Sequence, residues 1–398
     1  VALTVALREL GITPDAVAPY SLTVNTSTKA YTIGGAGITG TGGLTKSGTT
    51  ALTLNGTNSY TGATMVNAGS LVLGGVLGGS SITIATNASL SQSAGSVIAG
   101  SAVTLTCSGN STLAGTNTYG GATTVGVSGT PNLSLTVNNN AALGTTAAGT
   151  TVFGGDGSFL NRLYLGKGVT VTNETLTLNG SGGRSGLSYN QNSGTGTWAG
   201  DISCISAAYI ESATSGGTLT IGSDAKTVMT NAAACSVSMR GNGDIALNSW
   251  VAIGTGNTLL RNDAGTLLIN SANNVWGDTG LSEGTIRMNA TNGLPTTTVL
   301  SIGKSDKKSL CVLDLNGFDQ TIRGLVDVHY AGSGDTTGTQ RIISIAPATL
   351  TLSNDTARTF GKTNGCDWCM NLGELQLTPR AAALPDEAVV LTSATGMV

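Results

Sequence analysis

The acidic side chains are the first residues to test for chemistry, because glycoside hydrolysis needs two carboxyl groups held about 5–10 Å apart. The chain has 21 Asp and Glu residues, and they are scattered rather than clustered. Asp314 and Asp319 flank Asn316 in a predicted strand and turn, and Asp327 follows. No Asp-Asp pair and no Asn-Thr-Asp or Gly-His-Gly motif occurs. We interpret these acids as turn caps or surface groups. We therefore expect no enzyme, and a polysaccharide lyase or hydrolase is the alternative.

Metal-ligating residues are equally sparse. His329 is the single histidine of the chain, and we interpret it as structural. The segment Gly154-Gly-Asp156-Gly-Ser-Phe-Leu160 partly matches the glycine-aspartate calcium nonapeptide. That motif works in tandem, and here it stands once. The sequence predicts no metal site and no cofactor.

Two of the six cysteines have a spacing typical of redox or zinc-binding motifs, Cys366-Asp-Trp-Cys369. A zinc site needs four ligands, and a second close pair is missing. A redox motif belongs beside a βαβ unit, which the pattern does not contain. We predict a local disulfide between Cys366 and Cys369, with free buried thiols as the alternative.

The composition excludes several classes of partner. Only 10% of the residues are charged, against about 25% in soluble globular proteins, and the net charge is −3. Lys and Arg form no cluster, so a nucleic-acid partner is not expected. No run of about 18 apolar residues occurs, so no transmembrane segment is expected. Gly, Thr, Ser, Asn and Ala must therefore cover much of the surface.

The elements that position these residues are short strands. Apolar and polar residues alternate over three to five positions along the whole chain, as in Leu52-Thr-Leu54 and Leu71-Val-Leu73. Gly and Asn bound these alternations, and a period of two between turn formers indicates half-buried strands. Helical patterns are nearly absent. The sequence predicts an all-β protein.

Internal repeats indicate how the strands are arranged. Residues 55–66 align with 114–125 without a gap, and 267–288 matches 52–73 at ten positions. The strand at Leu52 recurs at Leu71 within one copy, and this short spacing suggests one coil of a parallel β-solenoid. Stacked coils bury a continuous apolar column that one coil cannot bury. At about 20–25 residues per coil, we expect roughly 16–20 coils. An antiparallel β-sandwich or barrel is the alternative.

Stacking also explains the low charge, because equivalent side chains of successive coils lie directly opposite and like charges there destabilise a sheet. Asparagine amides at the turns can instead form hydrogen-bonded ladders. The predicted ladder residues are Asn55, Asn58, Asn117, Asn270 and Asn273. Cys204 and Cys235 are separated by more than one such coil, so they would meet across adjoining coils if one coil carries a loop.

A known repeat family shares these features. Gly42-Gly-Leu-Thr-Lys-Ser-Gly48, continuing through Leu52-Thr-Leu-Asn-Gly56 to Gly69-Ser-Leu-Val-Leu73, resembles the autotransporter-associated β-strand repeat. Leu313-Asp-Leu-Asn-Gly317 resembles a segment that commonly follows such repeats. The resemblance covers 42–75, 104–126 and 264–325, about a third of the chain. It implies a right-handed parallel β-helix, exported as a type V secretion passenger and placed outside a Gram-negative-type bacterium. The family has no shared catalytic residues to carry over.

Together these observations predict an extracellular structural or adhesive β-solenoid of the bacterial surface or matrix. We expect an N-terminal cap or docking segment at 1–30, the solenoid at 31–365, and a C-terminal cap or docking segment at 366–398. Self-association into a head-to-tail filament would use apolar terminal segments. Their docking residues are Val1, Leu3, Val5, Leu7, Val389, Val390 and Leu391. The alternatives are a surface adhesin that binds glycans or a receptor through loops of 181–262, and a β-helix polysaccharide lyase or hydrolase.

Overall fold

The computed structural model describes residues 16–353 apart from 80, 128–131, 156, 158–159, 173, 182, 224–226, 232–234, 305–308 and 329–339, and the backbone of 376–379 and 389–393. The chain divides into two units. Unit 1 holds 1–188 and 199–203, and unit 2 holds 189–198 and 204–398. Residues His329, Cys366, Cys369, Val1, Leu3, Val5 and Leu7 lie outside the described part.

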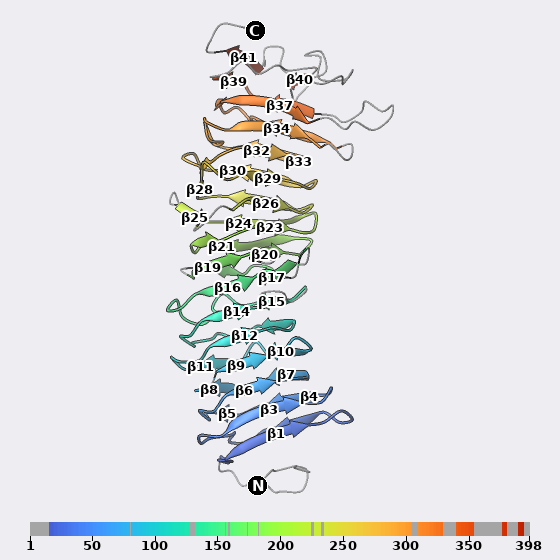
Figure 1. Ribbon diagram of the computed structural model, residues 1–398, viewed down its shortest axis with the longest axis vertical. Helices are drawn as coiled ribbons and strands as arrows, with labels where there is room; N and C mark the ends of the chain where they lie inside the picture. Colours follow the sequence, from blue (N-terminus) through green and yellow to red (C-terminus); the bar gives the residue numbers. More distant parts are fainter. Residues whose placement is uncertain are drawn as a thin grey trace. The chain divides into compact units, whose positions relative to one another are not determined.

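Unit 1 is built from short strands that pair with the strand one coil away, and Figure 1 shows them stacked coil upon coil. One sheet contains β1 (Ser21–Asn25), β3 (Gly43–Ser47), β6 (Thr64–Val66), β9 (Ile82–Ile84), β12 (Leu105–Cys107), β14 (Thr123–Val125), β16 (Thr150–Phe153) and β19 (Leu176–Asn179). A second contains β2 (Tyr31–Ile33), β4 (Ala51–Leu54), β7 (Gly69–Leu73), β10 (Ala88–Gln92), β13 (Ser111–Leu113), β15 (Ser134–Val137) and β17 (Leu160–Leu165). A short third sheet contains β5 (Thr57–Asn58), β8 (Val76–Gly78) and β11 (Val97–Ala99). Three further strands are β18 (Thr170–Val171), β20 (Arg184–Tyr189) and β22 (Ile202–Cys204), and the last residues of β20 and β22, Tyr189 and Cys204, belong to unit 2.

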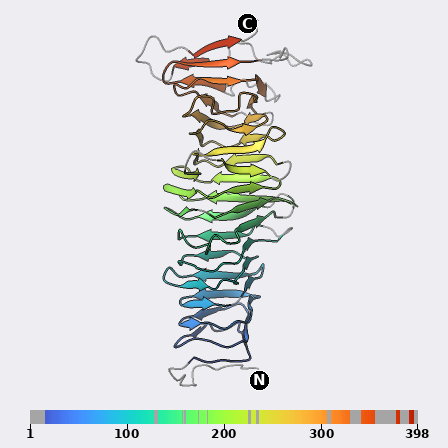
Figure 2. The same ribbon diagram turned by 90° about the vertical axis from the view of Figure 1, so that its left-hand side faces the viewer.

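Unit 2 repeats this arrangement, as Figure 2 shows for its own coils. One sheet contains β25 (Thr227–Asn231), β28 (Trp250–Gly254) and β31 (Val275–Trp276). A second contains β23 (Ala208–Ser212), β26 (Val237–Arg240), β29 (Leu259–Arg261), β32 (Thr279–Leu281), β34 (Val299–Gly303) and β37 (Gly324–Val328). A third contains β21 (Gly194–Trp198), β24 (Gly217–Ile221), β27 (Asp244–Leu247), β30 (Thr266–Ile269), β33 (Gly284–Met288), β35 (Cys311–Asp314), β38 (Gln340–Ser344) and β40 (Gln376–Pro379). A fourth contains β36 (Gln320–Ile322), β39 (Ala348–Leu352) and β41 (Val389–Ser393).

The pairing confirms the β-solenoid. Every strand pair whose register is described is parallel, so the antiparallel sandwich or barrel is wrong. Leu52 pairs with Leu71 and Leu71 with Leu90, so these successive coils have equal length. Inward residues such as Leu52 and Leu54 are fully buried, while Thr53 between them faces outward. The period of two therefore places the apolar column inside.

The solenoid has about 12 turns among the described residues, fewer than the 16–20 expected. The reason is that coils lengthen in the middle of the chain. Thr136 pairs with Tyr164, and Tyr209 pairs with Ser238, so one coil there uses more residues than the coil from Leu52 to Leu71. Corners of the shorter coils are tight: Gly56 has a φ of 72°, and a Cβ built there would clash with the Gly35 carbonyl oxygen.

The coil strands reach into both predicted end segments. β1 lies within 1–30 and pairs with β3, because Leu22 already supplies an inward apolar side chain. β41 lies within 366–398 and pairs with β39. Among the described residues, no helix has the length and hydropathy that crossing a membrane requires.

Candidate functional surface and polar sites

An asparagine ladder runs along one corner of unit 2. Asn248, Asn270 and Asn289 each follow directly after a strand, and Asn316 lies two residues beyond β35. Asn270 Nδ2 donates to Asn248 Oδ1 at 2.6 Å, and Asn289 Nδ2 donates to Asn270 Oδ1 at 2.6 Å. Asn316 Nδ2 continues the ladder to Asn289 Oδ1 at 2.8 Å. Asn270 therefore belongs to a ladder of four amides, three of which the sequence analysis did not select.

Asn58 and Asn117 occupy a different position, because both are buried. Asn58 Oδ1 accepts from the Ile38 N–H of the coil before, and its Nδ2 donates to Val76 O of the coil after. Asn117 joins Ile98 N to Ala142 O in the same way. These amides bridge three coils through backbone groups. Asn55, by contrast, has Gly74 above it, so the next coil offers it no amide partner.

The gapless alignment of 52–73 with 267–288 predicts that Asn273 is the equivalent of Asn58, and the structure does not place it there. Its neighbour Asn274 is buried, accepts from Val251 N at 2.8 Å and donates to Gly293 O at 2.8 Å, as Asn58 does in its own coils. Asn273 instead adopts a φ of 63°. The chain has one extra residue at this turn, so the correct equivalent is Asn274.

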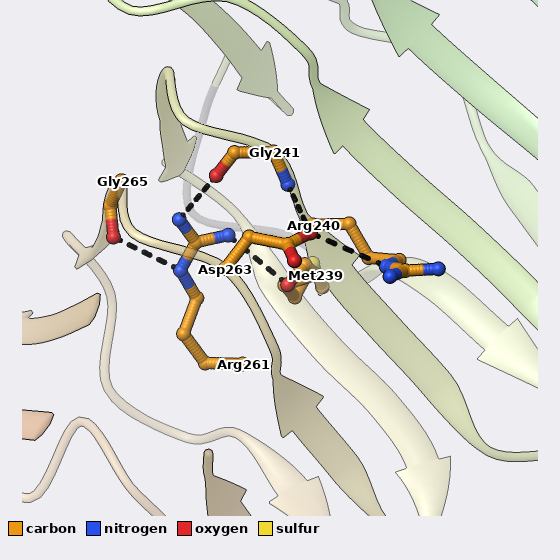
Figure 3. Close-up of polar contacts among 6 residues, drawn as sticks. All are labelled: Met239, Arg240, Gly241, Arg261, Asp263 and Gly265. Atoms are coloured by element: carbon orange, nitrogen blue, oxygen red, sulfur yellow. Dashed lines mark hydrogen bonds and ion pairs between the residues drawn. The ribbon is translucent and has the colours of Figure 1, made fainter. Parts of the chain in front are cut away.

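Arg261 is a fully buried cation at the end of β29. Its Nε donates to Gly265 O at 3.0 Å, its Nη1 to Met239 O at 3.1 Å and its Nη2 to Gly241 O at 2.7 Å (Figure 3). Burial lowers the pKa of Arg261 to about 10, and the nearby carboxylates, Asp263 first, act against that shift. The guanidinium gives a second hydrogen bond to each of these carbonyls, which also accept from the backbone N–H groups of Asn262, Gly265 and Thr285.

Asp263 connects this buried cation to the surface. Its Oδ2 accepts from the Gly241 N–H at 2.8 Å and from Arg240 Nε at 3.3 Å (Figure 3). The Arg240 guanidinium lies 5.3 Å from the centre of the Tyr209 ring. The cluster is internally paired, and this makes it a stabilising contact between neighbouring coils of unit 2.

Lys46 is the equivalent buried cation of unit 1. Its Nζ donates to Ser47 O at 2.9 Å, Gly48 O at 2.7 Å and Ala68 O at 3.2 Å. Burial lowers the pKa of Lys46. The three carbonyls use all three N–H donors of the ammonium group.

Glu174 is a buried carboxyl, 4% exposed. Its Oε1 accepts from Thr150 Oγ1 at 2.9 Å. Burial raises the pKa of Glu174 from 4.5 to about 7, and the Thr150 hydrogen bond acts in the opposite direction. A carboxyl with such a pKa changes its charge near neutral pH.

The acids selected from the sequence are engaged in local contacts. Asp314 is buried, and its Oδ2 lies 2.8 Å from Arg287 Nη2. Asp319 Oδ1 accepts from the Thr349 N–H at 2.7 Å. The side chain of Asp327 is not among those described. Within the described residues, no three His, Cys, Asp or Glu side chains gather closely enough to hold a metal.

A small polar cleft opens on unit 2, with a volume of about 230 Å³. Its lining residues are Thr255, Gly256, Asn257, Thr258, Gly277, Asp278, Thr297 and Arg323. Arg323 Nη2 lies 3.6 Å from Asp278 Oδ1, and Arg323 Nε has no hydrogen-bond partner among the described residues. The volume is below the roughly 300–1,000 Å³ of drug-sized pockets, so the cleft suits a small polar group. One wall, 255–258, falls in the predicted binding stretch 181–262.

Trp198 and Trp276 are fully buried, so neither side chain is available to stack on a sugar. The remaining predicted features are placed as follows. The predicted docking residues Val389, Val390 and Leu391 lie in β41, whose backbone pairs with β39 of the same chain. Cys204 and Cys235 are both buried, and their thiols are hydrogen-bonded to each other.

Comparison with known families gives one match, to the passenger-associated-transport-repeat, over residues 44–73. This chain carries an autotransporter passenger repeat. The resemblance drawn from the sequence is therefore confirmed. No curated protein and no solved structure matched the chain.

The passenger repeat runs from β3 to β7, which is more than one coil, because Leu44 already pairs with Thr64 and Leu52 with Leu71 inside it. It contains the buried Lys46 and Asn58, and also Tyr60, whose hydroxyl lies 2.6 Å from Thr64 Oγ1. Tyr119 contacts Thr123 in the same way, and Trp276 Nε1 donates to Thr279 Oγ1 at 2.8 Å. The repeat thus corresponds to a set of buried polar contacts that recurs in both units.

Proposed function

We propose that this protein is a structural and adhesive passenger-like β-solenoid at the bacterial surface or in its matrix, and that its copies associate with one another. The observation that carries the proposal is the asparagine ladder formed by Asn248, Asn270, Asn289 and Asn316. Each amide has two N–H donors, and Asn270, Asn289 and Asn316 each use one of them within the ladder. The other donors can bond to a partner, repeated at a coil spacing of about 4.8 Å.

The low charge supports the same proposal. With 10% charged residues, the surface carries few groups whose repulsion would keep copies apart. A second solenoid offers amides and hydroxyls at the same spacing, so matched copies can form many weak hydrogen bonds in register. The pairing of β41 with β39 shows in addition that the stack extends by parallel strand addition.

Electron microscopy and light scattering of the purified full chain test this proposal. We expect filaments or sheets whose mass increases with protein concentration. The variant Asn270→Asp/Asn289→Asp places like charges one coil apart on the ladder, and it should reduce association at neutral pH. Asn87→Asp, at an exposed turn of unit 1, is the matched control. Monodisperse monomers of the wild-type chain at all concentrations would contradict the proposal.

The polar cleft of unit 2 favours glycan contact as a second candidate function. Thr255, Thr258 and Thr297 supply hydroxyls around Asp278 and Arg323, which together suit a sugar hydroxyl or acid group. Binding of the full chain to an array of neutral and acidic glycans tests this candidate. Asp278→Asn/Arg323→Gln should abolish binding, while Asp201→Asn, at an exposed carboxyl, should preserve it. Binding that survives the double change would exclude the cleft.

We propose a non-enzymatic role for the chain. The support is that Asp314 is paired with Arg287 and that Asp319 accepts from Thr349, so these carboxylates already have structural partners. Screening the full chain on pectins, alginates and host glycans is the direct test. Product release from any of them would favour the β-helix lyase or hydrolase instead.

A further inference from the structure

Cys204 and Cys235 lie in consecutive coils of unit 2. Cys204 ends β22, and Cys235 lies two residues before β26. The pairing of Ala208 with Val237 shows that the chain segments after the two cysteines stack directly on each other. The coil that separates them is longer than the coil from Leu52 to Leu71. The loop that the sequence analysis required is therefore present.

The structure holds the two thiols against each other. Both side chains are buried, with exposed fractions of 0% and 2%. The Cys235 N–H donates to Asn257 Oδ1 at 2.6 Å, and its sulfur contacts the Ser206 carbonyl oxygen. These contacts fix the backbone and the side chain of Cys235. The hydrogen bond between the thiols then brings the sulfur atoms close together.

The register of the Ala208–Val237 pair places Cys235 beside Ser206, two residues after Cys204 in the preceding coil. Neighbouring parallel strands lie about 4.8 Å apart and disulfides join residues whose Cα atoms are roughly 4.4–6.8 Å apart, so the contact between the thiols, and not direct stacking of the two residues, is what favours a covalent bond. We propose that Cys204 and Cys235 form a disulfide that ties two consecutive coils of unit 2 together when the chain folds under oxidising conditions. The other described cysteines, Cys107 and Cys311, are also buried.

The bond forms by thiol–disulfide exchange. The thiolate of one of the two cysteines attacks one sulfur of an oxidant disulfide such as glutathione disulfide and releases one glutathione thiolate. The thiolate of the other cysteine then attacks the cysteine sulfur of the mixed disulfide and releases the second glutathione, so two thiols are oxidised and one disulfide is reduced.

The burial of both thiols determines at which stage of folding the disulfide forms. An oxidant cannot reach thiols that are almost completely covered, so oxidation must precede the stacking of these coils. The finished bond is shielded from reductants for the same reason. The crosslink is therefore a folding product that persists in the native chain.

Peptide mapping by mass spectrometry tests this proposal on the full chain, refolded from the reduced and denatured state in a glutathione redox buffer. We expect one peptide pair linked through Cys204 and Cys235, resistant to dithiothreitol in the native chain and lost on reduction in denaturant. Cys107→Ser should preserve it, and Cys204→Ser should remove it. A Cys366–Cys369 disulfide would appear in a separate peptide, so the two are distinguished.

Thermal unfolding is the second measurement. The disulfide closes the loop between Cys204 and Cys235 and should raise the midpoint temperature of unfolding by about 5 °C. Reduction in denaturant before refolding should remove this increase. Cys204→Ser/Cys235→Ser should show no such difference. Recovery of both cysteines as alkylated free thiols from the oxidised wild-type chain, or their bonding to other cysteines, would overturn the proposal. Neither readout depends on association between copies, so the result is independent of the proposed function.

Discussion

Replacing Glu174 by Gln should change how the stability of unit 1 depends on pH. Glutamine keeps the size of the side chain and an oxygen that accepts from Thr150 Oγ1, but it cannot ionise. Tyr119 interacts electrostatically with Glu174, and it stays neutral over the range of interest because burial raises its pKa. The variant therefore isolates one buried carboxyl.

The magnitude follows from the pKa of Glu174. Burial raises it from 4.5 to about 7, so between these values the folded state binds more protons than the unfolded state. The stabilising contribution of the protonated group is complete below about pH 4.5 and is lost as the pH rises through 7. Each pKa unit corresponds to about 1.4 kcal/mol, so the full loss is about 3 kcal/mol. The Glu174→Gln variant does not lose this stability, because its side chain cannot ionise.

Urea unfolding followed by circular dichroism at pH 5, 6, 7 and 8 measures the effect. The difference in free energy of unfolding, Glu174→Gln minus wild type, should rise with pH up to 7 and then level off. Asp201→Asn, at an exposed carboxyl, should show a difference near zero throughout. Parallel curves for Glu174→Gln and the wild type from pH 5 to 8 would refute the reasoning, because they would mean that the carboxyl is not desolvated.

Three further substitutions test other polar contacts by urea unfolding. Arg261→Met should lower the free energy of unfolding by about 1.5–3 kcal/mol, because three buried carbonyls lose their hydrogen bonds to the guanidinium and keep only backbone donors; an effect below about 1 kcal/mol would show that water replaces the guanidinium. Asn58→Leu should cost about 2–4 kcal/mol, since the Ile38 N–H and the Val76 carbonyl lose their partner, and an unchanged midpoint would contradict the bridging role. Asn270→Asp should cost about 0.5–1.5 kcal/mol at pH 7 and less at pH 3, where the protonated side chain can donate to Asn248 again. A pH-independent cost would argue against the ladder.

The coil architecture could be predicted because its physical cause is local. Leu52 and Leu71 face the same column only if the chain returns between them, and their spacing is visible in the sequence. The number of coils could not be predicted in this way. Insertions such as the one between Tyr209 and Ser238 lie outside the strands and leave no periodic pattern.

The buried polar groups were less predictable, although two of them leave a signal. Lys46 and Arg261 occupy inward positions of alternating strands, two residues after Leu44 and Leu259. A charged residue at an inward position predicts a buried cation that needs carbonyl partners. Glu174 has no such signal because it lies between strands, and its burial depends on the coils around it. Asn274 was missed because one inserted residue shifts the alignment.

The bridging amides also show how coils of unequal length remain in one stack. Parallel pairing satisfies the backbone within the strands, but each corner leaves N–H and C=O groups that have no partner in the next coil. In the longer coil that ends at Tyr164, Asn161 accepts from Leu133 N and donates to Phe153 O, so it closes the longer corner as Asn58 closes a short one. Because side chains satisfy these corners from inside, the length and composition of the outward loops can vary without unpairing the core. The outward positions, including the asparagine ladder and the polar cleft, are therefore where this protein can acquire specific binding at little cost in stability.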